Sequence, residues 1–156
     1  MKLYIEQKVF SWADRFSVSD EFGAPRYFVE GEIFTWGKRL HVYDAFQREA
    51  AYIEQQVPSF LPRYRVFVEG RLIAEIVRQF SFFVPRYSIE ELGWEIEGSF
   101  LLHDYTITRN GKPVVSIRKE WMTWGDCYEL DIADPRDELP ALCVVLTIDC
   151  VIAQSQ

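Results

Sequence analysis

The sequence predicts a mostly β protein, a closed antiparallel β-barrel of about twelve strands in about six hairpins around a central hydrophobic C-terminal α-helix. Three observations predict this fold: an internal repeat of hairpin length, turn signals within the repeat, and one long apolar segment near the C-terminus. The chain has 156 residues, which is the size of one domain. We therefore expect residues 1–156 to form a single domain, with the central helix at about 137–153.

The repeat begins with Ser or Thr and a large aromatic residue, followed at fixed offsets by a large apolar residue and then an aliphatic one. Its copies recur about every 18 to 24 residues, which suits one β-hairpin and its connection. Two looser copies, around Phe83 and Leu101, lack the leading Ser or Thr. We expect the shared aromatic position, which includes Trp12, Trp36 and Trp124, to pack into the barrel. The four clear copies begin at Ser11-Trp12, Thr35-Trp36, Ser59-Phe60 and Thr123-Trp124.

Turn chemistry divides each copy into two alternating runs. Residues 20–25, Glu69-Gly70 and Asn110-Gly111 separate such runs, and Asn-Gly between alternating runs is the strongest short hairpin signal. A sheet of about twelve strands would expose two long edges unless it closed. A barrel of that width is too wide for side chains alone to fill. The sequence therefore predicts that something bulky occupies the interior.

Residues 139–153 are apolar on nearly every side, which is typical of a helix buried in protein or lipid. The run is longer than ordinary strands, which favours a helix although Val and Ile dominate it. Its start is predicted either at Asp134-Pro135, as N-cap and first helical residue, or at Asp137 one turn later. A membrane span needs about 20 apolar residues, whereas this run is shorter and contains Asp149. We therefore expect the helix to thread the barrel.

Charge and cysteine content exclude several classes of function. The formal net charge is −7, with 24 acidic and 17 basic residues, whereas generic nucleic-acid binders carry a basic stripe. Broad attraction to an anionic membrane is also disfavoured, although a small local basic site stays open. The cysteines number three and form no metal or redox motif. We expect reduced, mostly buried thiols and a cytoplasmic protein.

A local anion site is the first candidate site. Pro-Arg-Tyr occurs three times, beginning at Pro25, Pro62 and Pro85, and proline can begin a strand but not sit centrally in a sheet. These tripeptides therefore predict strand entries. Arg favours phosphate through its planar guanidinium group, and ordinary surface arginines are the alternative interpretation. The candidate lipid- or anion-binding residues are Lys38, Arg39, Arg63 and Arg86.

Carboxylates supply two further candidates. Asp149 interrupts the apolar helix, where a carboxylate needs a partner. We expect a structural buried carboxylate that reaches an Arg, a Tyr hydroxyl or water near the barrel rim, and a perturbed site carboxylate is the alternative. An acidic stretch before the helix is interpreted as solvated turns and caps, with a weak Ca²⁺ site as the alternative. The metal candidates are Asp126, Asp131 and Asp134.

Enzymatic signals are weak. The two histidines, His41 and His103, are isolated in the sequence, and no Ser-His-Asp set, Walker loop, dinucleotide fingerprint or zinc-protease motif occurs. We predict no catalytic residue, no cofactor and no enzyme activity.

Several segments together resemble bacterial members of the LURP-one-related family, over essentially the whole chain. The resemblance implies the tubby C-terminal-like fold, a twelve-stranded barrel around a central hydrophobic helix. The segments are Lys2-Leu3-Tyr4-Ile5, Lys8-Val9-Phe10-Ser11-Trp12, Ser59-Phe60-Leu61-Pro62-Arg63-Tyr64 and Leu92-Gly93-Trp94-Glu95-Ile96-Glu97-Gly98.

The same superfamily includes tubby proteins, which bind phosphoinositides, and phospholipid scramblases. The chain's ending is similar to the scramblase ending, with an acidic segment and then an apolar helix that carries Ile148-Asp149. It departs from both relatives, because the scramblase calcium segment is only loosely matched and the basic residues with which tubby holds its lipid have no match.

The resemblance and the local arginines favour a non-enzymatic binding or interaction module that contacts phospholipid head groups at the inner membrane surface. The alternative is a small-molecule-binding protein or enzyme with a pocket at a barrel end. Partners are otherwise undetermined, with no nucleic acid and no transmembrane segment expected.

Overall fold

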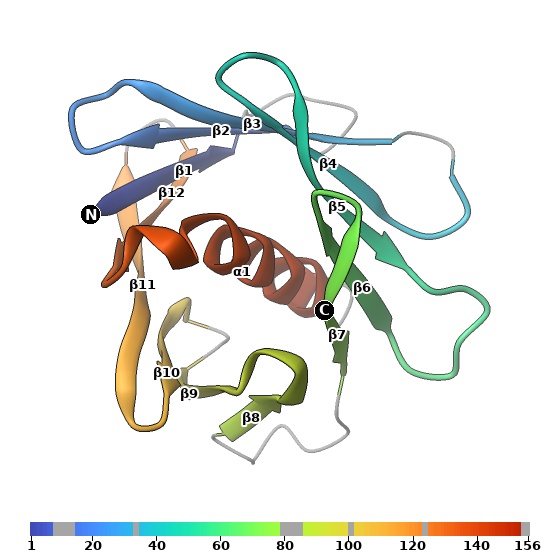
Figure 1. The fold of residues 1–156 in the computed structure, drawn as a ribbon. Helices are drawn as coiled ribbons and strands as arrows, with labels where there is room; N and C mark the ends of the chain where they lie inside the picture. Colours follow the sequence, from blue (N-terminus) through green and yellow to red (C-terminus); the bar gives the residue numbers. More distant parts are fainter. Residues whose placement is uncertain (8–14, 33–34, 79–85, 100–101, 123–124, 154–156) are drawn as a thin grey trace.

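The chain forms a nearly closed barrel of antiparallel strands with one helix through its centre (Figure 1). The computed structural model describes residues 1–7, 15–32, 35–78, 86–99, 102–122 and 125–153. The strands are β1 (Lys2–Gln7), β2 (Arg15–Asp20), β3 (Pro25–Gly31), β4 (Arg39–Asp44), β5 (Glu49–Gln55), β6 (Arg63–Val68), β7 (Arg71–Val77), β8 (Arg86–Ile89), β9 (Trp94–Ser99), β10 (Asp104–Arg109), β11 (Lys112–Met122) and β12 (Gly125–Ile132). The helices are the short 3₁₀ turns η1 (Glu90–Leu92) and η2 (Pro135–Asp137) and the α-helix α1 (Glu138–Ala153).

The sheet follows the chain almost without crossovers. Its twelve strands run in the order β7-β6-β5-β4-β3-β2-β1-β12-β11-β10-β9-β8, and every neighbouring pair is antiparallel. The two end strands face each other across a seam, where the Val77 backbone N–H donates to the Tyr87 hydroxyl at 2.8 Å. The predicted fold class is therefore confirmed, with closure completed at the seam by side chains and not by a full strand ladder.

The predicted strand entries are also confirmed. β3 begins at Pro25, and β6 and β8 begin at Arg63 and Arg86, the arginines of the other two Pro-Arg-Tyr tripeptides. Strand direction alternates around the barrel, so all even-numbered strands begin at one rim and all odd-numbered strands begin at the other.

Alternation of buried and exposed residues along the strands creates the core. In β5, Ala51 and Ile53 point inward, and they alternate with Tyr52 and Glu54, which lie on the outer face. The inward residues of all strands meet α1 in one continuous hydrophobic cluster.

The central helix is confirmed over Glu138–Ala153, within one residue of the predicted start. It is buried on nearly every side, with Ala141 through Val144 fully covered. Burial of each large aliphatic side chain contributes about 1.5–3 kcal/mol. The hydroxyl of the buried Thr147 donates to the Cys143 carbonyl at 2.8 Å, which satisfies a polar group inside the apolar helix.

The helix start combines both predicted signals. Asp134 caps η2, because its carboxylate accepts the backbone N–H of Arg136 at 2.9 Å, and Pro135 follows as the first residue of that turn. α1 then begins at Glu138, whose carboxylate receives a two-pronged ion pair from Arg26, with contacts of 2.8–3.1 Å. These contacts hold the helix start against β3. We call this end of the barrel the helix-start rim, and the opposite end the helix-end rim.

Candidate functional site

The helix-end rim carries the candidate site, because several predicted site residues gather there. All even-numbered strands begin at this rim, and His103, which precedes β10, lies beside Asp149 near the end of α1. Lys38 precedes β4, Arg39 begins it, and Arg63 begins β6. The predicted basic residues therefore share one end of the barrel.

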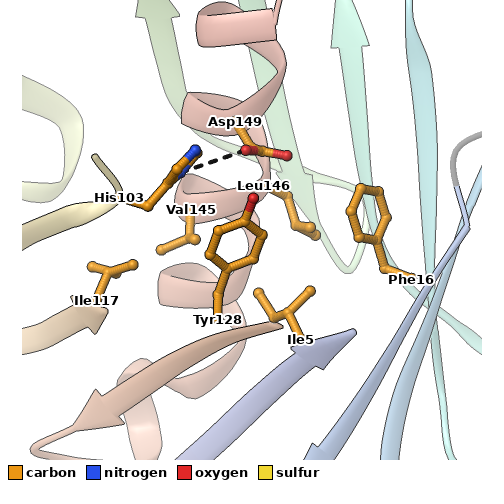
Figure 2. A pocket seen from close by; sticks show the side chains of 8 residues that line it. All are labelled: Ile5, Phe16, His103, Ile117, Tyr128, Val145, Leu146 and Asp149. Atoms are coloured by element: carbon orange, nitrogen blue, oxygen red, sulfur yellow. Dashed lines mark ion pairs between the residues drawn. The ribbon is translucent and has the colours of Figure 1, made fainter. Parts of the chain in front are cut away.

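Asp149 and His103 form the polar centre of this end (Figure 2). The Nδ1 atom of His103 lies 3.7 Å from Oδ1 of Asp149, and their side chains are 15% and 27% exposed. Asp149 is therefore partly buried, and its partner in this ion pair is a histidine that the sequence analysis treated as isolated. The two residues come from distant parts of the chain, and only the fold joins them.

Two tyrosines surround the pair. The rings of His103 and Tyr128 are 4.8 Å apart between centroids, and Figure 2 shows the Tyr128 hydroxyl pointing toward the Asp149 carboxylate. Burial, followed by the negative charge of Asp149, raises the pKa of Tyr105 well above its usual value. Tyr128 lines the small cavity beside the pair.

His103 is held in the left-handed backbone region, with φ of 52°. Histidine is among the non-glycine residues that adopt this conformation more often than most. The imidazole lies beside Asp149, near the end of α1.

The cavity beside this pair is small. Its volume is about 10 Å³, with Ile5, Phe16 and Val145 among its walls, and that volume matches roughly one water molecule. Figure 2 shows these side chains filling the space around the polar pair. The cavity beside Asp149 and His103 therefore has room for about one water molecule.

Two of the four predicted basic residues, Arg39 and Arg63, form ion pairs with carboxylates. Arg39 lies 3.7 Å from Glu32, and Arg63 forms an ion pair with Glu75. The backbone N–H of Lys38 donates to the Gln55 side chain at 3.0 Å. The backbone of Arg86 begins β8, and its side chain lies outside the described residues.

Two of the three residues named for the alternative Ca²⁺ site, Asp131 and Asp134, have described side chains. Within the described ranges, no group of three or more His, Cys, Asp or Glu side chains could hold a metal ion. Asp134 is held by Arg136, with 2.7 Å between the charged atoms, and the hydrogen bond from this Arg side chain lowers the pKa of Asp134 to about 2. Asp131 lies opposite Lys2 in the register of the β1–β12 ladder, and the Asp126 side chain lies outside the described residues.

The repeat aromatics overturn one expectation. Trp36 is 80% exposed and Phe60, at the same position of the next repeat, is 91% exposed. The expectation that this position packs into the barrel is therefore wrong for Trp36, while Trp12 and Trp124 lie outside the described residues. The repeat places these aromatics on connections between strands, beyond the reach of the core.

The cysteines behave as predicted. Cys127, Cys143 and Cys150 are free and buried. Burial raises the pKa of Cys143 to about 12, which keeps its thiol protonated. No helix in the described part of the chain is long and apolar enough to cross a membrane.

Comparison with known proteins places the chain in a family. The family model described as LURP-one-related matches residues 1–149. The chain belongs to the LURP-one-related family. It is 32% identical over 152 residues to YxjI of Bacillus subtilis (strain 168), a protein described as uncharacterised, and the match covers 97% of this chain and 94% of YxjI.

A solved structure shares the fold. An X-ray structure of a protein from Arabidopsis thaliana superposes with a TM-score of 0.59 at 11% identity, over 95% of this chain and 91% of that one. The family model and the match to YxjI confirm the family resemblance read from the sequence. At this identity the structural likeness concerns the fold alone.

Proposed function

We propose that this protein is a non-enzymatic binding module that contacts phospholipid head groups at a membrane surface through its helix-end rim. The observation that carries the proposal is the exposure of large apolar side chains on the strand connections of this rim. Trp36, Phe60 and Leu102 are 80%, 91% and 72% exposed. A water-soluble surface gains nothing from such side chains, whereas an interface with lipid does.

Two of these connections touch each other. A Cβ atom placed on Gly37 would lie 3.1 Å from the Val57 side chain, so the connection before β4 packs against the connection before β6. Trp36 and Phe60 therefore project from neighbouring segments. Tryptophan favours the boundary between head groups and acyl chains, because its ring is apolar and its N–H is polar.

Basic residues follow the exposed aromatic residues closely in the sequence of each connection. Lys38 and Arg39 follow Trp36, and Arg63 follows Phe60 in the next connection. Insertion of the aromatic rings would bring these cations to the level of the phosphates. Each Lys or Arg near an anionic surface contributes about 1 kcal/mol. Because the net charge of −7 opposes binding at long range, apolar insertion has to supply the main attraction.

Vesicle flotation tests the proposal. We expect the chain to float with phosphatidylcholine vesicles that contain phosphatidylserine, and Trp36→Ala/Phe60→Ala to lose most of that binding. Phe22→Ala/Phe46→Ala is the matched control, because these aromatics are 88% and 79% exposed in turns at the helix-start rim. Absence of co-flotation at low salt, or an equal loss in the control, would remove the proposal.

A further inference from the structure

The outer wall of the barrel carries a second hollow. It is an open groove of about 510 Å³ over β4, β5 and β6, and pockets that bind small molecules span roughly 300–1,000 Å³. Its lining residues are His41, Glu49, Ala50, Ala51, Tyr52, Glu54, Phe67, Glu69 and Gly70.

The floor of the groove is a ladder of rings. His41, Tyr52 and Phe67 are directly opposite one another on adjacent strands. The ring centroids of His41 and Tyr52 are 5.0 Å apart, and those of Tyr52 and Phe67 are 6.1 Å apart. Aromatic faces carry negative electrostatic potential, so this floor attracts cations and also packs against methylene groups.

The walls of the groove are acidic. Glu49 and Glu69 lie where β4 runs into β5 and where β6 runs into β7, and Glu54 lies toward the opposite end of the floor. Neither Lys nor Arg is among the lining residues. Glu54 already accepts hydrogen bonds from Tyr52 and Gln56 at 3.0 and 2.9 Å. Glu49 and Glu69 lie at the other end of the floor from Glu54, and Glu49 is already in contact with His41.

His41 controls the charge of one wall. Its ring nitrogens lie 2.7 Å from Glu49 and 2.7 Å from Glu32, and Glu32 is also 3.7 Å from Arg39. When the imidazole is protonated it neutralises part of the charge of Glu49. An incoming ammonium group would compete with His41 for this carboxylate.

We propose that this groove binds a linear polyamine, with its methylene segments over the Tyr52 and Phe67 rings and its ammonium groups against Glu49 and Glu69. Separated carboxylates along an aromatic floor match a ligand whose charges are separated by short apolar spacers. A compact quaternary ammonium ion would use the rings but only one carboxylate, and an anion would be repelled by all three. The carboxylates assigned to the ligand, Glu49 and Glu69, lie at the helix-start end of these strands, whereas the Glu54 end of the groove adjoins Arg39 of the helix-end rim.

Isothermal titration calorimetry of the full chain with spermine tests the proposal. We expect saturable binding of one spermine per chain at physiological salt. Glu49→Gln/Glu69→Gln should weaken it about tenfold, since two ion pairs with the ligand at the protein surface are lost. Phe67→Leu keeps the apolar bulk and removes the ring, and it should weaken binding about threefold.

The matched control separates a site from general attraction to an acidic protein. Glu90→Gln/Glu91→Gln removes the same charge from exposed residues of η1 and should leave the affinity within about twofold. An equal loss in this control, or no saturable heat, would overturn the proposal. Equally tight binding of tetramethylammonium or of trilysine would overturn the polyamine assignment. Unchanged thermal unfolding of each variant establishes that the fold is intact, and unchanged flotation of Glu49→Gln/Glu69→Gln would show that the two proposals are separate.

Discussion

Replacement of Arg26 by Met tests how the central helix is held at its start. Glu138 is the first residue of α1, and its side chain is only 10% exposed, whereas that of Arg26 is 41% exposed. The guanidinium group donates three hydrogen bonds of 2.8–3.1 Å to this carboxylate. In Arg26→Met the carboxylate would stay in its covered position without its cation.

The expected loss follows from the burial of the two partners. An unpaired buried charge costs about 3–5 kcal/mol when both partners are fully buried. Here solvent reaches Arg26, and Tyr27 also faces Glu138: burial first, and then the Glu138 charge, raises the pKa of Tyr27 to about 12. The remaining tyrosine contact and partial hydration reduce the expected loss to about 1–2 kcal/mol. For a chain of this size that loss lowers the midpoint of thermal unfolding by about 2–8 °C.

Urea unfolding of four proteins completes the test: wild type, Arg26→Met, Glu138→Gln and the double variant. We expect Glu138→Gln to lose less than Arg26→Met, because an exposed arginine can be hydrated, and the double variant to recover part of the loss. Arg15→Met is the matched control, since Arg15 and Glu30 are 49% and 43% exposed and 3.6 Å apart. It should stay within about 0.5 kcal/mol of wild type. If Arg26→Met lost no more than this control, the described role of the ion pair would be wrong.

Two further predictions concern the sheet. Gly98→Ala should lower the free energy of unfolding in urea by about 2–4 kcal/mol, because the φ of Gly98 is 130° and a Cβ there would lie 2.7 Å from the Tyr105 Cα atom. Gly111 has open space around it, so Gly111→Ala should lower the free energy of unfolding by only about 1 kcal/mol. Equal losses in the two variants would contradict the steric argument. For His41, partial burial lowers the pKa, but hydrogen bonds to two glutamates outweigh it and raise the pKa above 6.5. A group whose pKa is higher in the folded chain than in the unfolded chain stabilises the fold at pH values below its unfolded pKa. That stabilisation is lost as the pH rises through the folded pKa. The stability advantage of wild type over His41→Gln should therefore be larger at about pH 5.5 than at about pH 8.5, and a constant difference would contradict it.

The sequence was sufficient to predict the barrel and its central helix because both depend on periodicity. Strand alternation and turn residues such as Asn110-Gly111 are local signals. The apolar run of α1 is equally local, and its length distinguishes it from a strand. The position of Trp36 was not predictable in the same way, because a repeat shows that positions are equivalent and does not show which side of a rim they face.

The two polar sites depend on long-range register, which single residues do not reveal. His103 and Asp149 meet only when β10 has been placed beside the end of α1. The ring ladder depends on the exact pairing of His41 with Tyr52, and an irregularity in the β4–β5 register follows directly at Val42 and Tyr43. A one-residue slip moves every side chain to the opposite face of a sheet. Such sites therefore become visible only once the pairing is known.

The two ends of the barrel differ in a way that bears on function. At the helix-start rim, Arg26 and Arg109 clamp Glu138 and Asp137, with charged atoms 2.8 and 2.9 Å apart. The N-terminal amino group adds a 3.0 Å hydrogen bond to the Ile132 carbonyl. The helix-end rim instead pairs one histidine with Asp149 at 3.7 Å. Large aromatic side chains are exposed at both rims, Phe22 and Phe46 at the helix start and Trp36 and Phe60 at the helix end. Exposure alone therefore does not separate the two ends, and the flotation comparison of the two double variants decides whether the helix-end rim meets a surface outside the molecule.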